Sequence, residues 1–316
     1  MTERAYDRDF LPLLSELPSV QDFSSAEKIH AIREMRASIA PPPFNSEDVV
    51  IRDEMIAGYQ GAPDVQIRIY RPKQDVTSPR PALLEIHGGG FILGNIEMMD
   101  AWCQAMAIEI DAVIVSVGYR LAPEAPFPAG LHDCYAALVW LKENASDLTI
   151  DPNRIAIAGQ SAGGGLAAGL ALFARDQGGP NICFQLLEIP ELDDRLDTPS
   201  MLSFQDTPFW NRPNAVWSWK HYLGPNHSGE TSIYAAPARA RDLAGLPPTY
   251  ISTMEFDPLR DEGLRYGMAL LEAGISVELH SYSGTFHGSA FFPQAEPTRR
   301  NTAEIIAILR RRLHPE

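Results

Sequence analysis

A single serine framed by glycines constrains this chain more than any other feature. Residues 159–163 read Gly-Gln-Ser-Ala-Gly, which has the G-x-S-x-G form of a nucleophile elbow, the sharp turn between a strand and a helix that exposes a serine hydroxyl. The preceding run, residues 154–158, is apolar and suited to a buried strand, and residues 162–175 are rich in alanine and leucine, as a helix should be. The sequence therefore predicts a strand that ends at Ser161 and a helix that begins there.

A second glycine-rich segment lies upstream of the first. Residues 87–90, His-Gly-Gly-Gly, follow the apolar run 82–86. Such a loop can turn backbone N–H groups toward a developing oxyanion. At average composition, G-x-S-x-G alone arises by chance in roughly one chain in ten of this length, and then marks only a glycine-rich turn. The two motifs together, in this order, predict a serine nucleophile beside a cradle for the charge that its attack creates.

Apolar runs alternate with helix-like segments along most of the chain. The predicted strands are residues 49–57, 65–70, 82–86, 112–117, 155–158, 182–189, 249–253 and 276–280. The predicted helices are residues 24–40, which Pro41 to Pro43 would end, and residues 99–110, 131–144, 161–177, 259–273 and 297–313. This alternation predicts an α/β protein with a mostly parallel sheet covered on both faces.

One segment, residues 193–244, breaks this alternation. It has no strand repeat, and its aromatic side chains include Phe209, Trp210, Trp217, Trp219 and Tyr222. We expect this insertion and residues 1–45 to form a cap that shapes the substrate pocket, over a catalytic domain of residues 46–192 and 245–316. Most of the aromatics are expected to pack within the insertion, with one or two facing the substrate.

Charge and composition exclude several other classes of protein. The net charge is −15 and the isoelectric point is about 4.9, which disfavours nucleic acid and anionic membrane surfaces as partners. No apolar run reaches the roughly 18 residues of a spanning helix, and residues 1–7 do not resemble a secretory leader, so a cytoplasmic location is expected. Cys103, Cys134 and Cys183 follow no metal or disulfide spacing and are expected to be packed thiols.

Five stretches of the chain together resemble one known family. They are residues 86–94 (IHGGGFILG), 119–124 (YRLAPE), 151–164 (DPNRIAIAGQSAGG), 257–263 (DPLRDEG) and 286–288 (FHG). Their content and order resemble the hormone-sensitive-lipase-like branch of the α/β-hydrolases, the bacterial esterases often called family IV. The resemblance implies an α/β-hydrolase fold with an eight-stranded, mostly parallel sheet, an early antiparallel strand, flanking helices and a helical cap. By resemblance alone, a homodimer formed through the edge strand and the last helix is also expected.

A serine hydroxyl is a poor nucleophile at neutral pH and needs a base within hydrogen-bond reach. His287 follows the strand at residues 276–280, and Asp257, which follows the strand at residues 249–253, would orient His287 and stabilise its imidazolium form. The order Ser, Asp, His is that of the α/β-hydrolases. The alternatives are His132, His221, His227 and His280 as the base, and Glu255, Asp261, Asp193 and Asp194 as the acid. For Asp257 itself, the alternative is a role at the start of a helix.

The oxyanion hole is expected to use the backbone N–H of Ala162 and those of two glycines. The family resemblance favours Gly89 and Gly90, with Gly88 needed for the shape of the loop. His87 is expected to support this loop by hydrogen bonding rather than to act as a second base. Other polar groups are expected to brace the neighbouring loops: Tyr119, Arg120 and Glu124.

The chain also departs from the family pattern. Gln160 stands in the elbow where Asp is common, Gly118 stands where Asp usually precedes the YRLAPE stretch, and Gly288-Ser289 follows His287 where Gly-Phe is frequent. Glu188 ends an apolar run, where a carboxylate is costly unless it is paired or near solvent. Glu188 is therefore a pocket residue or a salt-bridged brace, and we favour the brace.

The sequence thus predicts a carboxylesterase that hydrolyses short-acyl esters of small molecules through an acyl-enzyme, with no metal or organic cofactor. Two alternatives remain open. One is a non-catalytic ligand-binding protein on the same scaffold, which would be expected to lose a triad residue, typically the histidine. The other is a hydrolase of lactones or amides, because the chemistry is shared.

Overall fold

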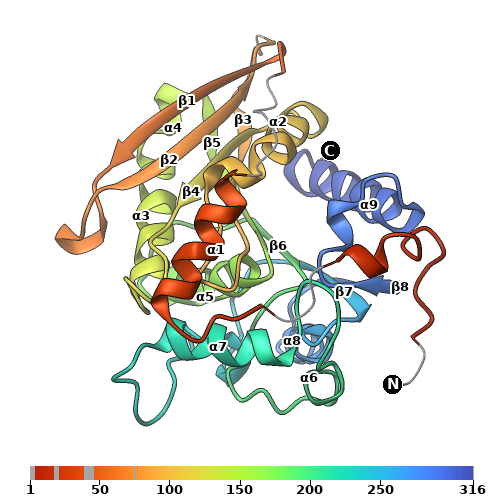
Figure 1. The fold of residues 1–316 in the computed structure, drawn as a ribbon. Helices are drawn as coiled ribbons and strands as arrows, with labels where there is room; N and C mark the ends of the chain where they lie inside the picture. Colours follow the sequence, from red (N-terminus) through yellow and green to blue (C-terminus); the bar gives the residue numbers. More distant parts are fainter. Residues whose placement is uncertain (1–3, 18–20, 39–45, 75, 316) are drawn as a thin grey trace.

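In a computed structural model, which describes residues 4–17, 21–38, 46–74 and 76–315, the chain forms one eight-stranded sheet (Figure 1). In chain order the strands are β1 (Val49–Ile56), β2 (Val65–Pro72), β3 (Arg80–Ile86), β4 (Val113–Gly118), β5 (Ile150–Gln160), β6 (Phe184–Glu188), β7 (Thr249–Phe256) and β8 (Val277–Phe286). Their order across the sheet is β1-β2-β4-β3-β5-β6-β7-β8. β2 is antiparallel to both of its neighbours, and the strands from β4 to β8 pair in parallel. The predicted fold class is confirmed.

Each predicted strand is present, and most boundaries agree within three residues, but the start of β5 and the end of β8 lie five and six residues outside the prediction. β5 begins at Ile150, five residues before the predicted start, because Ile150 already pairs with Arg80 of β3. β8 continues to Phe286, where Tyr282 and Phe286 pair with β7. Polar residues and a glycine between positions 280 and 285 weaken the apolar signal of this extension, which only the pairing with β7 defines.

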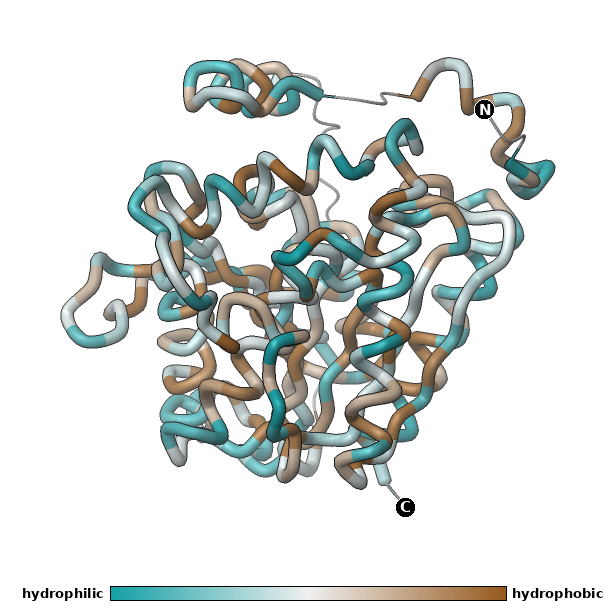
Figure 2. The backbone as a smooth tube through the Cα atoms, turned by 90° about the horizontal axis from the view of Figure 1, so that it is seen from below, coloured by the Kyte–Doolittle hydropathy of each residue, from teal (hydrophilic) through white to brown (hydrophobic). Residues whose placement is uncertain are grey.

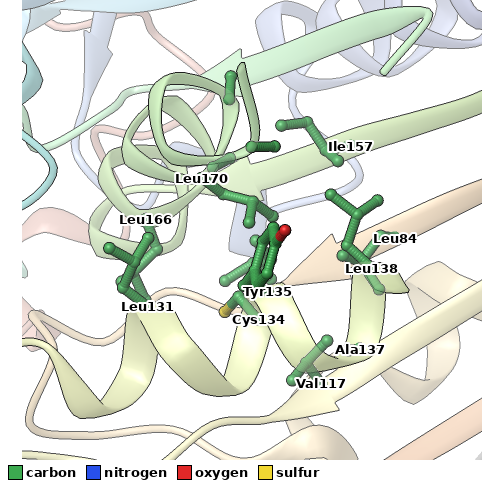
Figure 3. Packing of buried hydrophobic residues seen from close by; sticks show 14 of the residues in the cluster. Leu84, Val117, Leu131, Cys134, Tyr135, Ala137, Leu138, Ile157, Leu166 and Leu170 are labelled. Atoms are coloured by element: carbon green, nitrogen blue, oxygen red, sulfur yellow. The ribbon is translucent and has the colours of Figure 1, made fainter. Parts of the chain in front are cut away.

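Helices cover both faces of the sheet (Figure 1). α2 (Asp100–Glu109) and α9 (Glu296–Leu313) pack on one face; α3 (Ala129–Glu143), α5 (Ala162–Asp176) and α8 (Arg260–Glu272) pack on the other. Neighbouring strand residues serve opposite faces: Leu83 belongs to the core under α2 and α9, and Leu84 to the core under α3 and α5. Figure 3 shows Leu84 and Ile157 beside Leu138 of α3. A short helix that was not predicted, α4 (Ala145–Leu148), follows α3.

The helices predicted from composition are present, with ends that shift by one or two residues where the structure describes them. The predicted end of the first helix and the proline run at residues 41–43 lie outside the described residues. Cys103 and Cys134 are buried and Cys183 is half-buried, and all three are free thiols. No helix within the described ranges is long and apolar enough to cross a membrane.

The N-terminal helix and the insertion meet over the end of the sheet that carries Ser161. α1 (Ala26–Ser38) contributes Ile29 to an apolar cluster with Met201 of α6 (Pro199–Ser203) and Ala215 of α7 (Arg212–Leu223). The same cluster includes Ile92 and Leu93, from the loop after β3. Figure 2 shows hydrophobic stretches through the body of the molecule, with the described N-terminal segments along one side.

The first described residues pack elsewhere. Phe10 is buried against Phe286 at the end of β8, with ring centroids 5.2 Å apart. At the far end of the insertion, Ala235 and Leu243 join the main core beside α5. Some described residues of the predicted cap segments, residues 1–45 and 193–244, therefore pack against the catalytic domain. Others cover the end of the sheet that carries Ser161. Their grouping as one cap domain stays a prediction.

Candidate active site

Ser161 occupies the single position between the end of β5 and the start of α5. Its φ of +57° and ψ of −121° lie in a region that non-glycine residues avoid, at a cost of roughly 1–3 kcal/mol. A Cβ on Gly159 would lie 2.1 Å from the carbonyl oxygen of Gly163, and a Cβ on Gly163 would lie 2.0 Å from that of Ile86. Both glycines are therefore required by close packing of the helix on the sheet, and the serine is held on a tight turn as the motif predicts.

The three residues proposed from the sequence as nucleophile, base and acid form one hydrogen-bonded series. Ser161 Oγ lies 3.0 Å from His287 Nε2, and His287 Nδ1 lies 2.8 Å from Asp257 Oδ2. In the tautomer that carries its proton on Nδ1, His287 donates to Asp257, and Nε2 is free to accept the serine hydroxyl. All three side chains are buried.

Asp257 lies just before α8, but its side chain does not cap that helix: the N-cap residue is Leu259, which has no side-chain cap hydrogen bond. The second oxygen of Asp257, Oδ1, accepts the backbone N–H of Leu259 at 2.9 Å, just before α8 begins. The contacts of Asp257 with Leu259 and with His287 use different oxygens of the carboxylate. The bond to Leu259 fixes the carboxylate plane and so the direction in which it meets His287.

The other histidines and acids considered as candidates have partners elsewhere. His221 Nε2–H donates to the carbonyl of Phe23 at 2.7 Å, and Glu255 accepts the N–H of Gly284 at 2.7 Å. The remaining alternatives contact other groups: His132 the rings of Tyr59 and Phe173, His227 Thr231, His280 Glu304, Asp193 Arg195, Asp194 Arg239, and Asp261 Arg260. None of these contacts involves Ser161 or His287.

The glycine loop after β3 has its carbonyl groups fixed by hydrogen bonds. The Gly88 carbonyl accepts from His87 Nδ1–H at 2.8 Å, and the Gly90 carbonyl accepts from the Ser218 hydroxyl at 2.8 Å. The Gly89 carbonyl accepts two N–H groups of the following turn, at 2.8 and 3.2 Å. Within the described part of the chain, no acceptor receives the N–H of Gly89 or Gly90. These donors are available to a ligand in the pocket that both glycines share with Ser161.

The loop and the elbow approach each other closely. A Cβ on Gly88 would lie 2.8 Å from the carbonyl oxygen of Gln160, so Gly88 has no room for a side chain. Ala162 is the first residue of α5, where N–H groups have no acceptor within the helix. The four residues predicted for the oxyanion hole, Gly88, Gly89, Gly90 and Ala162, therefore adjoin Ser161 from two sides.

His87 supports the glycine loop through its contacts with Gly88 and Tyr119. Its ring stacks on Tyr119 with centroids 4.2 Å apart, and the Tyr119 hydroxyl donates to the His87 carbonyl at 2.9 Å. Burial lowers the pKa of His87 to about 4, so its ring is neutral near pH 7. The predicted supporting role is confirmed. The bracing roles predicted beside it are observed as ion pairs of Arg120 with Asp133 and of Glu124 with Arg33.

A narrow pocket holds the serine, the histidine and the glycine loop. Phe209 and Trp210 of the insertion line it, whereas Trp219 and Tyr222 are buried against Phe91. The pocket's lining residues are Arg36, Gly88, Gly89, Gly90, Leu93, Met98, Gln160, Ser161, Ile189, Phe209, Trp210, His287, Gly288 and Phe291. Two of the insertion's aromatics thus face the pocket.

Sequence reasoning missed Arg36, Met98 and Ser218 as site residues. Ser218 would be recognisable only from its bond to Gly90, which joins residues 128 positions apart. Arg36 and Met98 lie on or beside segments assigned as helices, where a polar or apolar stripe is the ordinary expectation. No local pattern marks any of these three.

Glu188 is not the salt-bridged brace that we favoured. It is 7% exposed, and its partner is the amide Nδ2 of Asn301 in α9, at 3.4 Å; within the described ranges no cation lies at ion-pair distance. Nor does it line the pocket. The expectation is wrong because the side chain faces α9, where a neutral amide is the available partner. Burial raises the pKa of Glu188 to about 7.

Replacing Glu188 with glutamine should change how stability depends on pH. Between about pH 4.5 and 7 the folded state keeps a proton that the unfolded glutamate has lost, so this group's contribution to the free energy of unfolding falls as pH rises. Glutamine cannot ionise, so Glu188→Gln should be more stable than the parent by up to about 3 kcal/mol at pH 8 and by much less at pH 5.

Urea unfolding at the two pH values measures this difference. Glu272→Gln, at an exposed position at the end of α8, is the matched control and should show no pH-dependent gain. An equal effect of Glu188→Gln at pH 5 and pH 8 would contradict the account of a buried carboxyl that ionises near neutrality.

Three features of this structure are typical of the α/β-hydrolases. They are the sheet, the strained turn at the serine, and the hydrogen-bonded series from Ser161 to His287 and Asp257. A family model described as alpha/beta hydrolase fold matches residues 83–291. The chain is 40% identical over 297 residues to the carboxylesterase NlhH of Mycobacterium tuberculosis, with 92% of each chain covered. It is 38% identical over 288 residues to the esterase LipI of the same organism, covering 90% of this chain and 88% of LipI.

Solved structures that resemble this chain are also those of esterases. A bacterial heroin esterase is 49% identical, with a TM-score of 0.93 and 98% of each chain covered. Esterase LipW from Mycobacterium marinum is 39% identical, with a TM-score of 0.88, covering 98% of this chain and 97% of LipW. The chain belongs to the α/β-hydrolase superfamily, in its hormone-sensitive-lipase-like branch, and its class is that of the carboxylic ester hydrolases.

Proposed function

We propose that the protein is a carboxylesterase for short-acyl esters of small molecules, with Ser161, His287 and Asp257 as its catalytic triad. The observation that carries this proposal is the hydrogen-bonded series from Ser161 Oγ through His287 to Asp257, at 3.0 and 2.8 Å. The presence of His287 in this series argues against a ligand-binding protein that has lost its base.

In the first half of the reaction, Ser161 Oγ attacks the ester carbonyl carbon while His287 Nε2 takes the hydroxyl proton. The carbonyl oxygen becomes an oxyanion, which the N–H groups of Gly89, Gly90 and Ala162 stabilise. The tetrahedral intermediate then breaks its bond to the alcohol oxygen, and His287 returns the proton to that oxygen. The alcohol leaves, and the acyl group stays on Ser161.

In the second half, water attacks the acyl carbon and gives a proton to His287 Nε2. The bond to Ser161 Oγ breaks, the serine recovers the proton, and the carboxylic acid is released. Throughout, Asp257 holds the imidazole in the tautomer that presents Nε2 to the serine and stabilises the imidazolium form without taking its proton. Its full burial strengthens this electrostatic contribution.

The preference for short acyl groups rests on how tightly aromatic side chains enclose the serine. A Cβ on Gly90 would lie 2.4 Å from Trp210, and a Cβ on Gly288 would lie 3.0 Å from Phe209. Ile189 and Leu93 complete the apolar wall. This space suits an acetyl or butyryl group better than an extended chain.

An acyl-length series of p-nitrophenyl esters tests the proposed function. We expect kcat/KM to be highest for the acetate or butyrate and to fall at least about tenfold for the laurate, because one methylene that fails to fit costs roughly 1–3 kcal/mol. A maximum at the laurate would contradict the short-acyl assignment. Absence of hydrolysis of every ester in the series would contradict the esterase assignment itself.

A further inference from the structure

Arg36 is the one permanently charged side chain among the described residues that line the Ser161 pocket. It lies in the last turns of α1, the helix that packs beside the insertion over this end of the sheet. The rest of the lining is apolar, glycine, or the neutral polar side chains of Gln160 and Ser161, together with His287. A charged side chain is costly in a partly apolar pocket unless it has a partner, so the position of Arg36 requires an explanation.

Among the described residues, the Arg36 guanidinium has one hydrogen-bond acceptor. One nitrogen, Nη2, donates to Gln21 Oε1 at 3.0 Å. In the parts of the chain that the structure describes, no carboxylate lies within ion-pair distance of Arg36. The two undescribed segments that flank α1, residues 18–20 and 39–45, contain no Asp or Glu. Partial burial lowers the pKa of Arg36, which remains cationic at neutral pH.

Arg33, on the same helix, is an arginine with a structural role and serves as a comparison for Arg36. Arg33, one turn earlier, contacts both oxygens of Glu124, at 2.8 and 3.1 Å, and also donates to the carbonyls of Ile92 and Ala122. Its charge is neutralised and its donors are used. Within the described ranges Arg36 has neither of these features, although both residues belong to α1.

An arginine with free donors in a partly apolar pocket is suited to a carboxylate, which it can bind through two parallel hydrogen bonds. The overall charge of −15 repels anionic substrates at long range. Selection of an anionic substrate therefore depends on a local cation near the reacting serine. Arg36 is in that position.

We propose that Arg36 binds a carboxylate group of the substrate, so that the preferred esters are anionic ones in which a carboxylate is carried by the acyl or the alcohol part. This inference rests on the proposed esterase function. Arg36 acts in it as a specificity residue: it contacts a part of the substrate away from the ester carbonyl and takes no part in proton transfer.

Two pairs of esters of matched shape test the inference. On the alcohol side, 4-acetoxybenzoate is compared with p-nitrophenyl acetate, because carboxylate and nitro groups have nearly the same shape. On the acyl side, mono-p-nitrophenyl glutarate is compared with p-nitrophenyl 5-methylhexanoate, with spontaneous hydrolysis subtracted. For each pair, selectivity is the ratio of kcat/KM for the anionic ester to that for the neutral ester.

Arg36→Gln should lower this selectivity about 10- to 100-fold in at least one pair, the size expected for a charge-assisted hydrogen bond. Arg36→Lys, which keeps the charge, should lower it less. Lys28→Gln is the matched control: it removes one charge from an exposed position on α1 that does not line the pocket, and should leave both ratios unchanged.

A change of less than about threefold in both pairs for Arg36→Gln would overturn the inference. So would an equal loss of activity on neutral and anionic esters, because that result indicates a purely structural role. These outcomes differ from failure of the proposed function, in which the parent protein hydrolyses neither p-nitrophenyl acetate nor any other ester of the set.

Discussion

Replacing Ser161 with alanine is expected to lower kcat for p-nitrophenyl butyrate by about 10⁴- to 10⁶-fold. The variant loses the atom that forms the acyl-enzyme, and a water molecule held beside His287 is a poor substitute. The oxyanion donors and the pocket remain, so some rate above the uncatalysed reaction is expected. Purified parent and variant compared at saturating ester give the number directly.

The fold should tolerate this change. Ser161 has a φ of +57°, and alanine pays a similar strain there, so the free energy of unfolding should change by less than about 1 kcal/mol. Ser146→Ala, at an exposed serine in α4, is the matched control and should keep full activity. If Ser161→Ala retained more than about one hundredth of the parent kcat, Ser161 would not be the nucleophile.

Replacing Gly90 with alanine is expected to have the second largest effect, a fall in kcat of about 10²- to 10³-fold with a smaller change in KM. The new Cβ would lie 2.4 Å from Trp210 Cη2 and 3.2 Å from Ser218 Oγ, the group that fixes the Gly90 carbonyl. The loop must therefore move, and its N–H groups would no longer meet the oxyanion at the correct distance. The loss should appear mainly in kcat because the oxyanion exists only during the reaction.

Gly178→Ala separates this crowding from backbone strain. Gly178, just beyond α5, has a φ of +59°, nearly equal to the +60° of Gly90, but a Cβ there would meet no atom within 4 Å. Both variants should lose about 1 kcal/mol of stability from the left-handed alanine. Gly90→Ala should lose more than this, because its Cβ is also crowded against Trp210. If Gly178→Ala lost as much kcat as Gly90→Ala, the effect would come from general destabilisation and not from the oxyanion loop.

The residues of the site could be predicted wherever the chemistry imposes a local pattern. Ser161 needs flanking glycines because α5 packs directly on β3 and β5, so the requirement is written into five consecutive residues. Asp257 and His287 each follow a strand of a parallel sheet, and carboxyl ends of such strands meet at one edge. Their short motifs and their order along the chain were enough to bring them together.

What could not be predicted depends on how distant segments dock. Arg36 faces the pocket because α1 crosses the sheet edge beside the insertion, which no periodicity within α1 encodes. The partner of Glu188 comes from α9, more than a hundred residues along the chain, and the sequence offered no reason to prefer Asn301 over a cation. The extra length of β8 arises from pairing with β7, against a polar local sequence.

In the proposed mechanism, Ser161 carries the acyl group during catalysis. Covalent labelling with a fluorophosphonate probe, followed by peptide mass spectrometry, tests it most directly, because the probe reacts with a serine only where a base and an oxyanion hole activate it. We predict one adduct on Ser161 of the parent protein, formed in step with loss of esterase activity, and no adduct on Ser161→Ala. An adduct on another residue, or none on a protein that still hydrolyses p-nitrophenyl butyrate, would contradict it.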